Sequence, residues 1–125
     1  ALKVQRRAAR VGFDWPGPAP VIDKLHEEID EVRAEFAAIA ADPGDSVAQA
    51  RLEEEIGDLL FVAANLARHA KVDVGSALRR ANHKFERRFR AMEAMAEADG
   101  TSLAGQPLDA QDGYWLRAKQ AERDP

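Results

Sequence analysis

The sequence predicts an all-α protein, and three observations support this fold class. Apolar residues recur at intervals of three and four over long stretches, which is the period of a helix. Glycine and proline are concentrated in a few short breaks between these stretches. No segment shows the alternation of apolar and polar residues that is typical of a half-buried strand. We therefore expect one four-helix-bundle-like domain over residues 1–125.

The first part of this domain, residues 1–18, is expected to be a short basic helix followed by an arm. The segment GFDWPGPAP at 12–20 contains too much glycine and proline to be helical. The bundle itself is expected within residues 19–125. Its helices are predicted over about 20–41, 47–70 and 74–98, with a last helix from about Leu108. The residues expected to face inward on the third of these are Leu78, Ala81, Phe85, Phe89 and Met92.

Composition limits the classes of function. The net charge of −4 disfavours a nucleic-acid coat, because binding to a phosphate backbone needs a basic face. No apolar run is long enough to span a membrane. The sequence has no cysteine, which removes disulfides, thiolate nucleophiles and thiolate metal sites and favours the cytoplasm. We expect neither nucleic acid nor membrane as a partner.

An internal repeat places two pairs of acids on corresponding helical faces. LHEEIDEV at 25–32 aligns with LEEEIGDL at 52–59, and each copy carries two acids three residues apart. Such residues lie on the same side of a helix, one turn on, and here both pairs flank the apolar stripe. If the two stripes pack antiparallel, the acidic pairs can face each other. The four acids are Glu28, Glu31, Glu55 and Asp58.

Four carboxylates at the edge of a core repel one another, and a hard divalent cation would relieve the repulsion. Mg²⁺ prefers oxygen ligands and works alongside substrate phosphates, with Mn²⁺ as a second candidate. A di-iron site is disfavoured because it requires Glu-x-x-His, and neither pair contains histidine. The alternative, in which the acids only solvate helix faces, stays open.

Basic residues could hold a polyphosphate beside such a cation. Lys84 and Arg88 are four residues apart and share a helical face, and Lys24 precedes Glu28 by four. The sequence has no Walker glycine loop, so side chains and metal would have to hold the phosphates. Trp115 could stack on a base or close a core, and the basic residues could simply pair with surface acids.

Beyond these patterns, the sequence contains an ordered set of short motifs that resembles the MazG family of all-α NTP pyrophosphohydrolases. The family signature EExxE…ExxD is matched at 27–31 and 55–58. The segments AARVGFDWP, EEIGDLLF, NLARH and ANHKFERRF are also similar to the family. The resemblance covers nearly the whole chain and is strongest to the C-terminal catalytic domain of a two-domain member. Since residue 1 is alanine, we expect a processed product or a piece of a longer protein.

The resemblance implies a Mg²⁺-dependent enzyme that converts NTPs and dNTPs to the monophosphate and pyrophosphate, keeps nucleotide pools clean and forms a homodimer. The apolar run Leu60-Phe61-Val62 also favours a dimer, because consecutive apolar residues make most sides of the helix apolar and such a helix needs neighbours. Two alternatives stay open: a pyrophosphatase specific for dUTP, dCTP or a modified nucleotide, and a non-catalytic interaction module. The implied catalytic metal ligands are Glu28, Glu31, Glu55 and Asp58, and the implied substrate-binding residues are Lys24, Lys84, Arg88 and Trp115.

Overall fold

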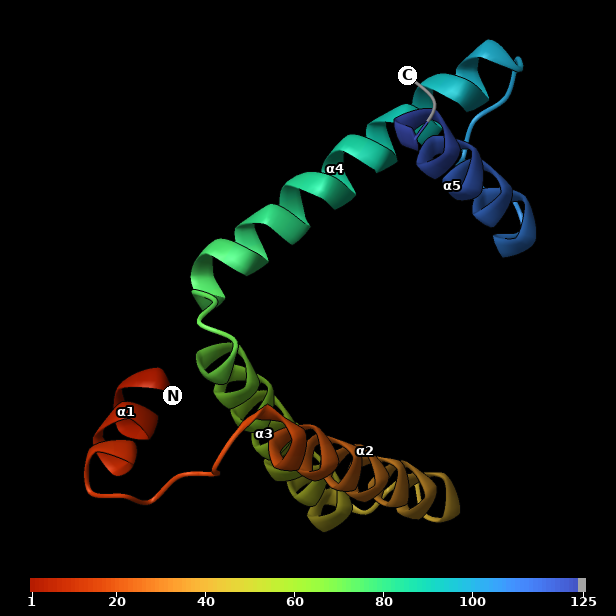
Figure 1. The fold of residues 1–125 in the computed structure, drawn as a ribbon. Helices are drawn as coiled ribbons and strands as arrows, with labels where there is room; N and C mark the ends of the chain where they lie inside the picture. The colour runs from red at the N-terminus through yellow and green to blue at the C-terminus, as the bar shows by residue number, and fades with distance from the viewer. Residues whose placement is uncertain (124–125) are drawn as a thin grey trace. The chain divides into compact units, whose positions relative to one another are not determined.

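The computed structural model describes residues 1–123, which contain five helices and no strand. The all-α prediction is confirmed, and each predicted helix boundary lies within two residues of the observed one. The helices gather into two compact units, Ala1–Val74 and Gly75–Pro125. A single bundle would require the two units to pack together, so the bundle and the one-domain organisation stay predictions. The helices are α1 (Leu2–Arg10), α2 (Pro18–Ala41), α3 (Ser46–His69), α4 (Val74–Ala98) and α5 (Leu108–Arg123) (Figure 1).

Helix α2 begins two residues earlier than the sequence predicted. Gly17 is its N-cap, and prolines occupy the first turn. Proline is tolerated there because the first N–H groups of a helix have no intrahelical acceptor, and its fixed φ is already helical. The end of the glycine- and proline-rich segment therefore starts the helix instead of preceding it.

Unit 1 is built on an antiparallel hairpin of α2 and α3, which lie side by side in Figure 1. The turn between them is short, and the Asp45 side chain caps α3 by accepting a hydrogen bond of 2.9 Å from the Val47 N–H. This cap satisfies one of the amide groups that the first turn leaves without a partner. Small and β-branched side chains fill the hairpin core and let the two helices approach closely. They include Val21, Val32, Ala48 and Val62.

Helix α1 docks onto α3 through a buried polar side chain. Gln5 is buried, and its Nε2 donates a 2.7 Å hydrogen bond to the Phe61 carbonyl oxygen. The apolar Val4 beside it remains exposed.

None of the helices in the described range carries an apolar stretch long enough to cross a membrane.

Unit 2 has a small core between α4, the following loop and α5. Met92 and Ala96 from α4 pack with Leu103 and Ala118. Gly100 ends α4 with a φ of 78°, a left-handed conformation that glycine adopts without steric cost. The core of unit 2 buries only the C-terminal end of the predicted α4 stripe, at Met92. The inward orientation of the other stripe residues depends on the bundle and stays a prediction, since the core of unit 2 does not bury them. Leu78, Ala81, Phe85 and Phe89 are exposed.

Candidate metal centre

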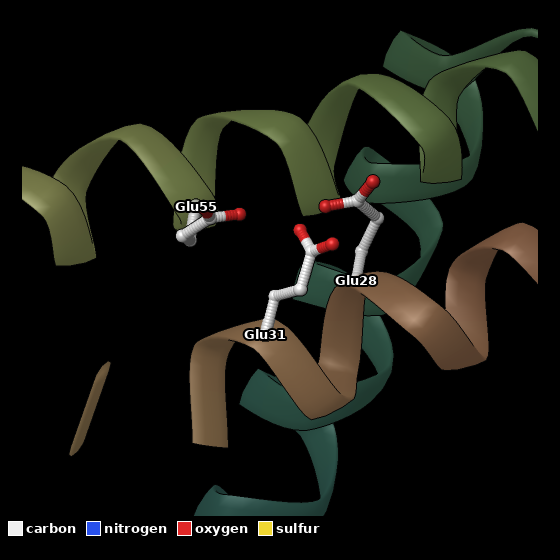
Figure 2. Close-up of side chains that lie close together, drawn as sticks. All are labelled: Glu28, Glu31 and Glu55. Atoms are coloured by element: carbon white, nitrogen blue, oxygen red, sulfur yellow. The ribbon is translucent and has the colours of Figure 1, made fainter. Parts of the chain in front are cut away.

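Three carboxylates converge in unit 1, from the facing sides of α2 and α3. One oxygen atom from each of Glu28, Glu31 and Glu55 lies within 4.8 Å of the other two. Figure 2 shows the carboxyl groups of Glu28 and Glu31 turned toward α3, where Glu55 lies. These three residues, called the acidic cluster below, come from both copies of the internal repeat.

The register of the hairpin explains this convergence. An ion pair of 3.1 Å between Arg51 Nε and Glu35 Oε2 joins the two helices on the loop side of the acidic cluster. Continuing in antiparallel register, residue 31 comes opposite residue 55, and residue 28 comes opposite residue 58. Asp58 is nevertheless exposed and does not belong to the acidic cluster. Its role as a fourth ligand stays a prediction.

Glu28 is the most buried member of the acidic cluster. Its exposed fraction is 5%, and it lies on the same face of α2 as the core residues Val21 and Val32. The Oε2 atoms of Glu28 and Glu55 are both buried and have no hydrogen-bond partner among the described residues. A buried carboxylate oxygen without a donor is costly and rare, unless water or an ion satisfies it. Hard oxygen donors of this kind fit Mg²⁺ or Mn²⁺.

One ammonium group offsets part of the negative charge. Lys24 Nζ lies 3.2 Å from Glu28 Oε1 and 3.3 Å from Glu27 Oε2. Burial raises the pKa of Glu28 above that of a free glutamate; the hydrogen bond from Lys24 opposes this rise, and the neighbouring Glu31 adds to it. The hydrogen bond to Glu28 in turn raises the pKa of Lys24. The cluster therefore holds a carboxylate whose charged form is disfavoured by its surroundings.

The other candidate substrate-binding residues lie in unit 2. Lys84 is exposed on α4. One turn further on, the Arg88 guanidinium lies 5.3 Å from the centre of the Trp115 ring and donates a 3.0 Å hydrogen bond from Nε to Glu122 Oε2. Trp115 also packs against Phe85 and lines a pocket of about 840 Å³ within this unit. The roles of Lys84, Arg88 and Trp115 at the acidic cluster stay predictions.

Sequence reasoning assigned no role to a polar clamp that holds the N-terminal arm on α3. The Asp14 carboxylate accepts a hydrogen bond from Arg68 and lies 3.1 Å from His69 Nε2. Arg68 is held in turn by the Oδ1 of Asn65, whose side chain is fully buried. The bond from Arg68 lowers the pKa of Asp14 despite its partial burial. Periodicity could not reveal this clamp, because Asp14 and Arg68 are 54 residues apart in the chain.

Comparisons with known proteins identify similar sequences over the hairpin and beyond it. Residues 17–92, which contain the whole α2–α3 hairpin, match the MazG nucleotide pyrophosphohydrolase domain. The chain is 47% identical over 124 residues to the nucleoside triphosphate pyrophosphohydrolase of Escherichia coli, covering 99% of this chain and 45% of that protein. It is 44% identical over 119 residues to the nucleoside triphosphate pyrophosphohydrolase/pyrophosphatase MazG of Thermotoga maritima, covering 95% of this chain and 42% of that protein. The chain thus spans less than half the length of these two relatives.

Proposed function

Because the chain belongs to the MazG family of nucleotide pyrophosphohydrolases, we propose that it hydrolyses nucleoside triphosphates to the monophosphate and pyrophosphate. The observation that carries this proposal is the acidic cluster, in which two buried carboxylate oxygens have no partner among the described residues. A non-catalytic interaction module would have no use for such oxygens, since leaving them unpaired only destabilises the fold. The E. coli and T. maritima relatives carry names that state this activity.

Glu28, Glu31 and Glu55 would hold a divalent cation, and Asp58 is the fourth candidate, one turn after Glu55. We propose Mg²⁺, with Mn²⁺ as the alternative, because every donor in the cluster is a carboxylate oxygen. When bound, such a cation supplies positive charge that stabilises the charge developing on phosphate oxygens.

Two basic side chains and one aromatic side chain of unit 2 are proposed to bind the nucleotide. Lys84 and Arg88 lie one turn apart on α4, so both can reach one triphosphate. Trp115 offers a ring face to the base, as it now does to Arg88. With the phosphates held, water attacks the α-phosphorus in line and pyrophosphate leaves.

We also propose a homodimer. Several large apolar side chains on the hairpin are exposed, including Leu60 at 64% and Phe36 at 56%. Ile22 and Ile29 lie at intervals of seven before Phe36 and are also exposed, so all three follow one face of α2. A helix that is apolar on a second face needs a neighbour to cover it. Light scattering at micromolar concentration should give twice the mass of the chain, and the mass of one chain would rule the dimer out.

The function is tested by identifying the products from each NTP and dNTP in the presence of Mg²⁺. The parent should release monophosphate and pyrophosphate, and a chelator should abolish this reaction. Glu55→Gln removes one member of the acidic cluster and should be inactive. Glu53→Gln makes the same change at an exposed site on the same helix and should retain activity. Release of diphosphate and orthophosphate would contradict the proposal.

A further inference from the structure

We propose that Lys24 and a divalent cation compete for Glu28, so that cation binding displaces the ammonium group. The inference rests on the proposed function, because it concerns the same acidic cluster. It adds a role for Lys24 in the absence of substrate: this residue occupies the site as a built-in counter-ion until a cation arrives.

The contacts of Glu28 favour this role. Its two carboxylate oxygens have different surroundings. Oε1 lies 3.2 Å from Lys24 Nζ, whereas Oε2 is buried without a partner among the described residues. The single ammonium therefore satisfies only half of a carboxylate group that also faces two other acids. A cation among the three acids would sit close to Lys24 Nζ, and two positive charges at short range in a partly buried site repel strongly.

Lys24 also has a second carboxylate partner, Glu27. Its Nζ lies 3.3 Å from Glu27 Oε2, and the Glu27 side chain is 65% exposed while that of Glu28 is 6% exposed. Lysine is a flexible, strongly hydrated point charge, so it can keep Glu27 as a partner after losing Glu28. An arginine held by a bidentate geometry could not be released so easily. Displacement would leave the ammonium paired with the exposed Glu27 carboxylate.

The first experiment measures the chemical reactivity of Lys24 in the parent chain. The protein is treated briefly with an amine-acylating reagent, with and without saturating Mn²⁺, and acylation of each lysine is quantified by mass spectrometry. Release from Glu28 should raise the rate at Lys24 several-fold. Lys3 and Lys71, which are exposed and lie outside the acidic cluster, serve as internal references and should not change. A rate at Lys24 that stays constant or falls would overturn the inference.

The second experiment measures Mn²⁺ affinity by calorimetry, with the metal alone and no nucleotide. Lys24→Met should bind about five-fold more tightly than the parent, equivalent to about 1 kcal/mol, because a partly exposed ion pair is worth about that much. Lys24→Gln keeps a hydrogen-bond donor without the charge and should behave alike, so it covers the case in which Lys24→Met does not fold. Lys24→Arg keeps the charge and is harder to release, so it should bind Mn²⁺ no more tightly than the parent.

Arg33→Met is the matched control, since it removes one positive charge from an exposed ion pair on the same helix. It should leave the affinity close to that of the parent. Unchanged or weaker Mn²⁺ binding in Lys24→Met and Lys24→Gln would overturn the inference, because Lys24 would then be a structural or positioning partner of Glu28. A parent chain that binds no Mn²⁺ and hydrolyses no NTP would instead refute the proposed function itself.

Discussion

Neutralising Glu28 is expected to stabilise the metal-free protein while destroying its response to metal. Glu28→Gln keeps the size and shape of the side chain and removes only its charge. The buried carboxylate lies close to two other acids, so the metal-free site stores electrostatic repulsion. The substitution should release that repulsion, and an amide group could also donate to the neighbouring carboxylates.

The size of the effect follows from the geometry. Glu28, Glu31 and Glu55 have oxygens within 4.8 Å of one another. At that separation two unit charges repel by about 1 kcal/mol when screened as in water and by about 3 kcal/mol at an effective dielectric constant of 20. Glu31 is exposed and Glu55 partly exposed, so the lower value applies, giving about 2 kcal/mol for the two neighbours.

The lost contact with Lys24 offsets part of this gain. Lys24 is 37% exposed and keeps Glu27 as a partner, so its pair with Glu28 is worth about 1 kcal/mol at most. The net stabilisation is about 1 kcal/mol, which raises the melting temperature by about 4 °C for a domain of this size.

Thermal melts with chelator and with Mg²⁺ measure this effect. In chelator, Glu28→Gln should melt about 4 °C above the parent. At a Mg²⁺ concentration of about 100 times Kd the parent should gain about 2.7 kcal/mol, whereas Glu28→Gln should gain little, so the order of the two melting temperatures reverses. Glu27→Gln is the control, because its exposed carboxylate contacts the same lysine. A Glu28→Gln variant that melts below the parent in chelator, or that Mg²⁺ stabilises as much as the parent, would contradict stored repulsion at Glu28.

Three further predictions concern other residues. Asp58→Asn should leave the melting temperature in chelator nearly unchanged, since Asp58 is exposed. As a proposed metal ligand, Asp58 should be needed for activity, so the variant should hydrolyse NTP more than about tenfold more slowly. Full activity would show that Asp58 is not a ligand. Lys84→Ala and Arg88→Ala should raise KM for NTP while leaving Mn²⁺ affinity in calorimetry intact, and unchanged kinetics in both would return them to surface pairing. Asp14→Asn should lower stability at neutral pH. Because the folded-state pKa of Asp14 is lowered, the difference in melting temperature between variant and parent should shrink as acid protonates Asp14 in the parent. A difference in melting temperature that did not change with pH would contradict the clamp.

The helices of this chain could be predicted almost completely, because local signals fix them. Asp42 to Ser46 break the first long apolar pattern, and the structure shows that Asp45 caps the next helix. The start of α2 was less predictable, since proline at 18 is compatible with either a loop or a first helical turn. The orientation of α4 was harder still, because periodicity identifies an apolar face without identifying what covers it.

The members of the acidic cluster were predictable in part, but its depth was not. The repeat indicated that four acids could meet, and the hairpin brings Glu28, Glu31 and Glu55 together. The fourth acid, Asp58, is exposed and lies outside the cluster. A helical wheel placed Glu28 beside the apolar stripe, yet it is more buried than Ile29 within that stripe. Sequence patterning normally assigns buried positions to apolar residues, and it fails where a charged residue occupies a position in the core. Contacts between distant residues, such as Asp14 with Arg68, leave no periodic signal in a single sequence.

The most direct test of the central claim is to follow hydrolysis of ATP and of one dNTP in ¹⁸O-labelled water by ³¹P nuclear magnetic resonance, with and without Mg²⁺. We expect monophosphate and pyrophosphate as the products in Mg²⁺, with ¹⁸O in the monophosphate, because water attacks the α-phosphorus. No turnover should occur in chelator, and Glu55→Gln should be inactive while Glu53→Gln is active. Diphosphate and orthophosphate as products, or equal turnover without a divalent cation, would contradict metal-dependent hydrolysis at the α-phosphorus.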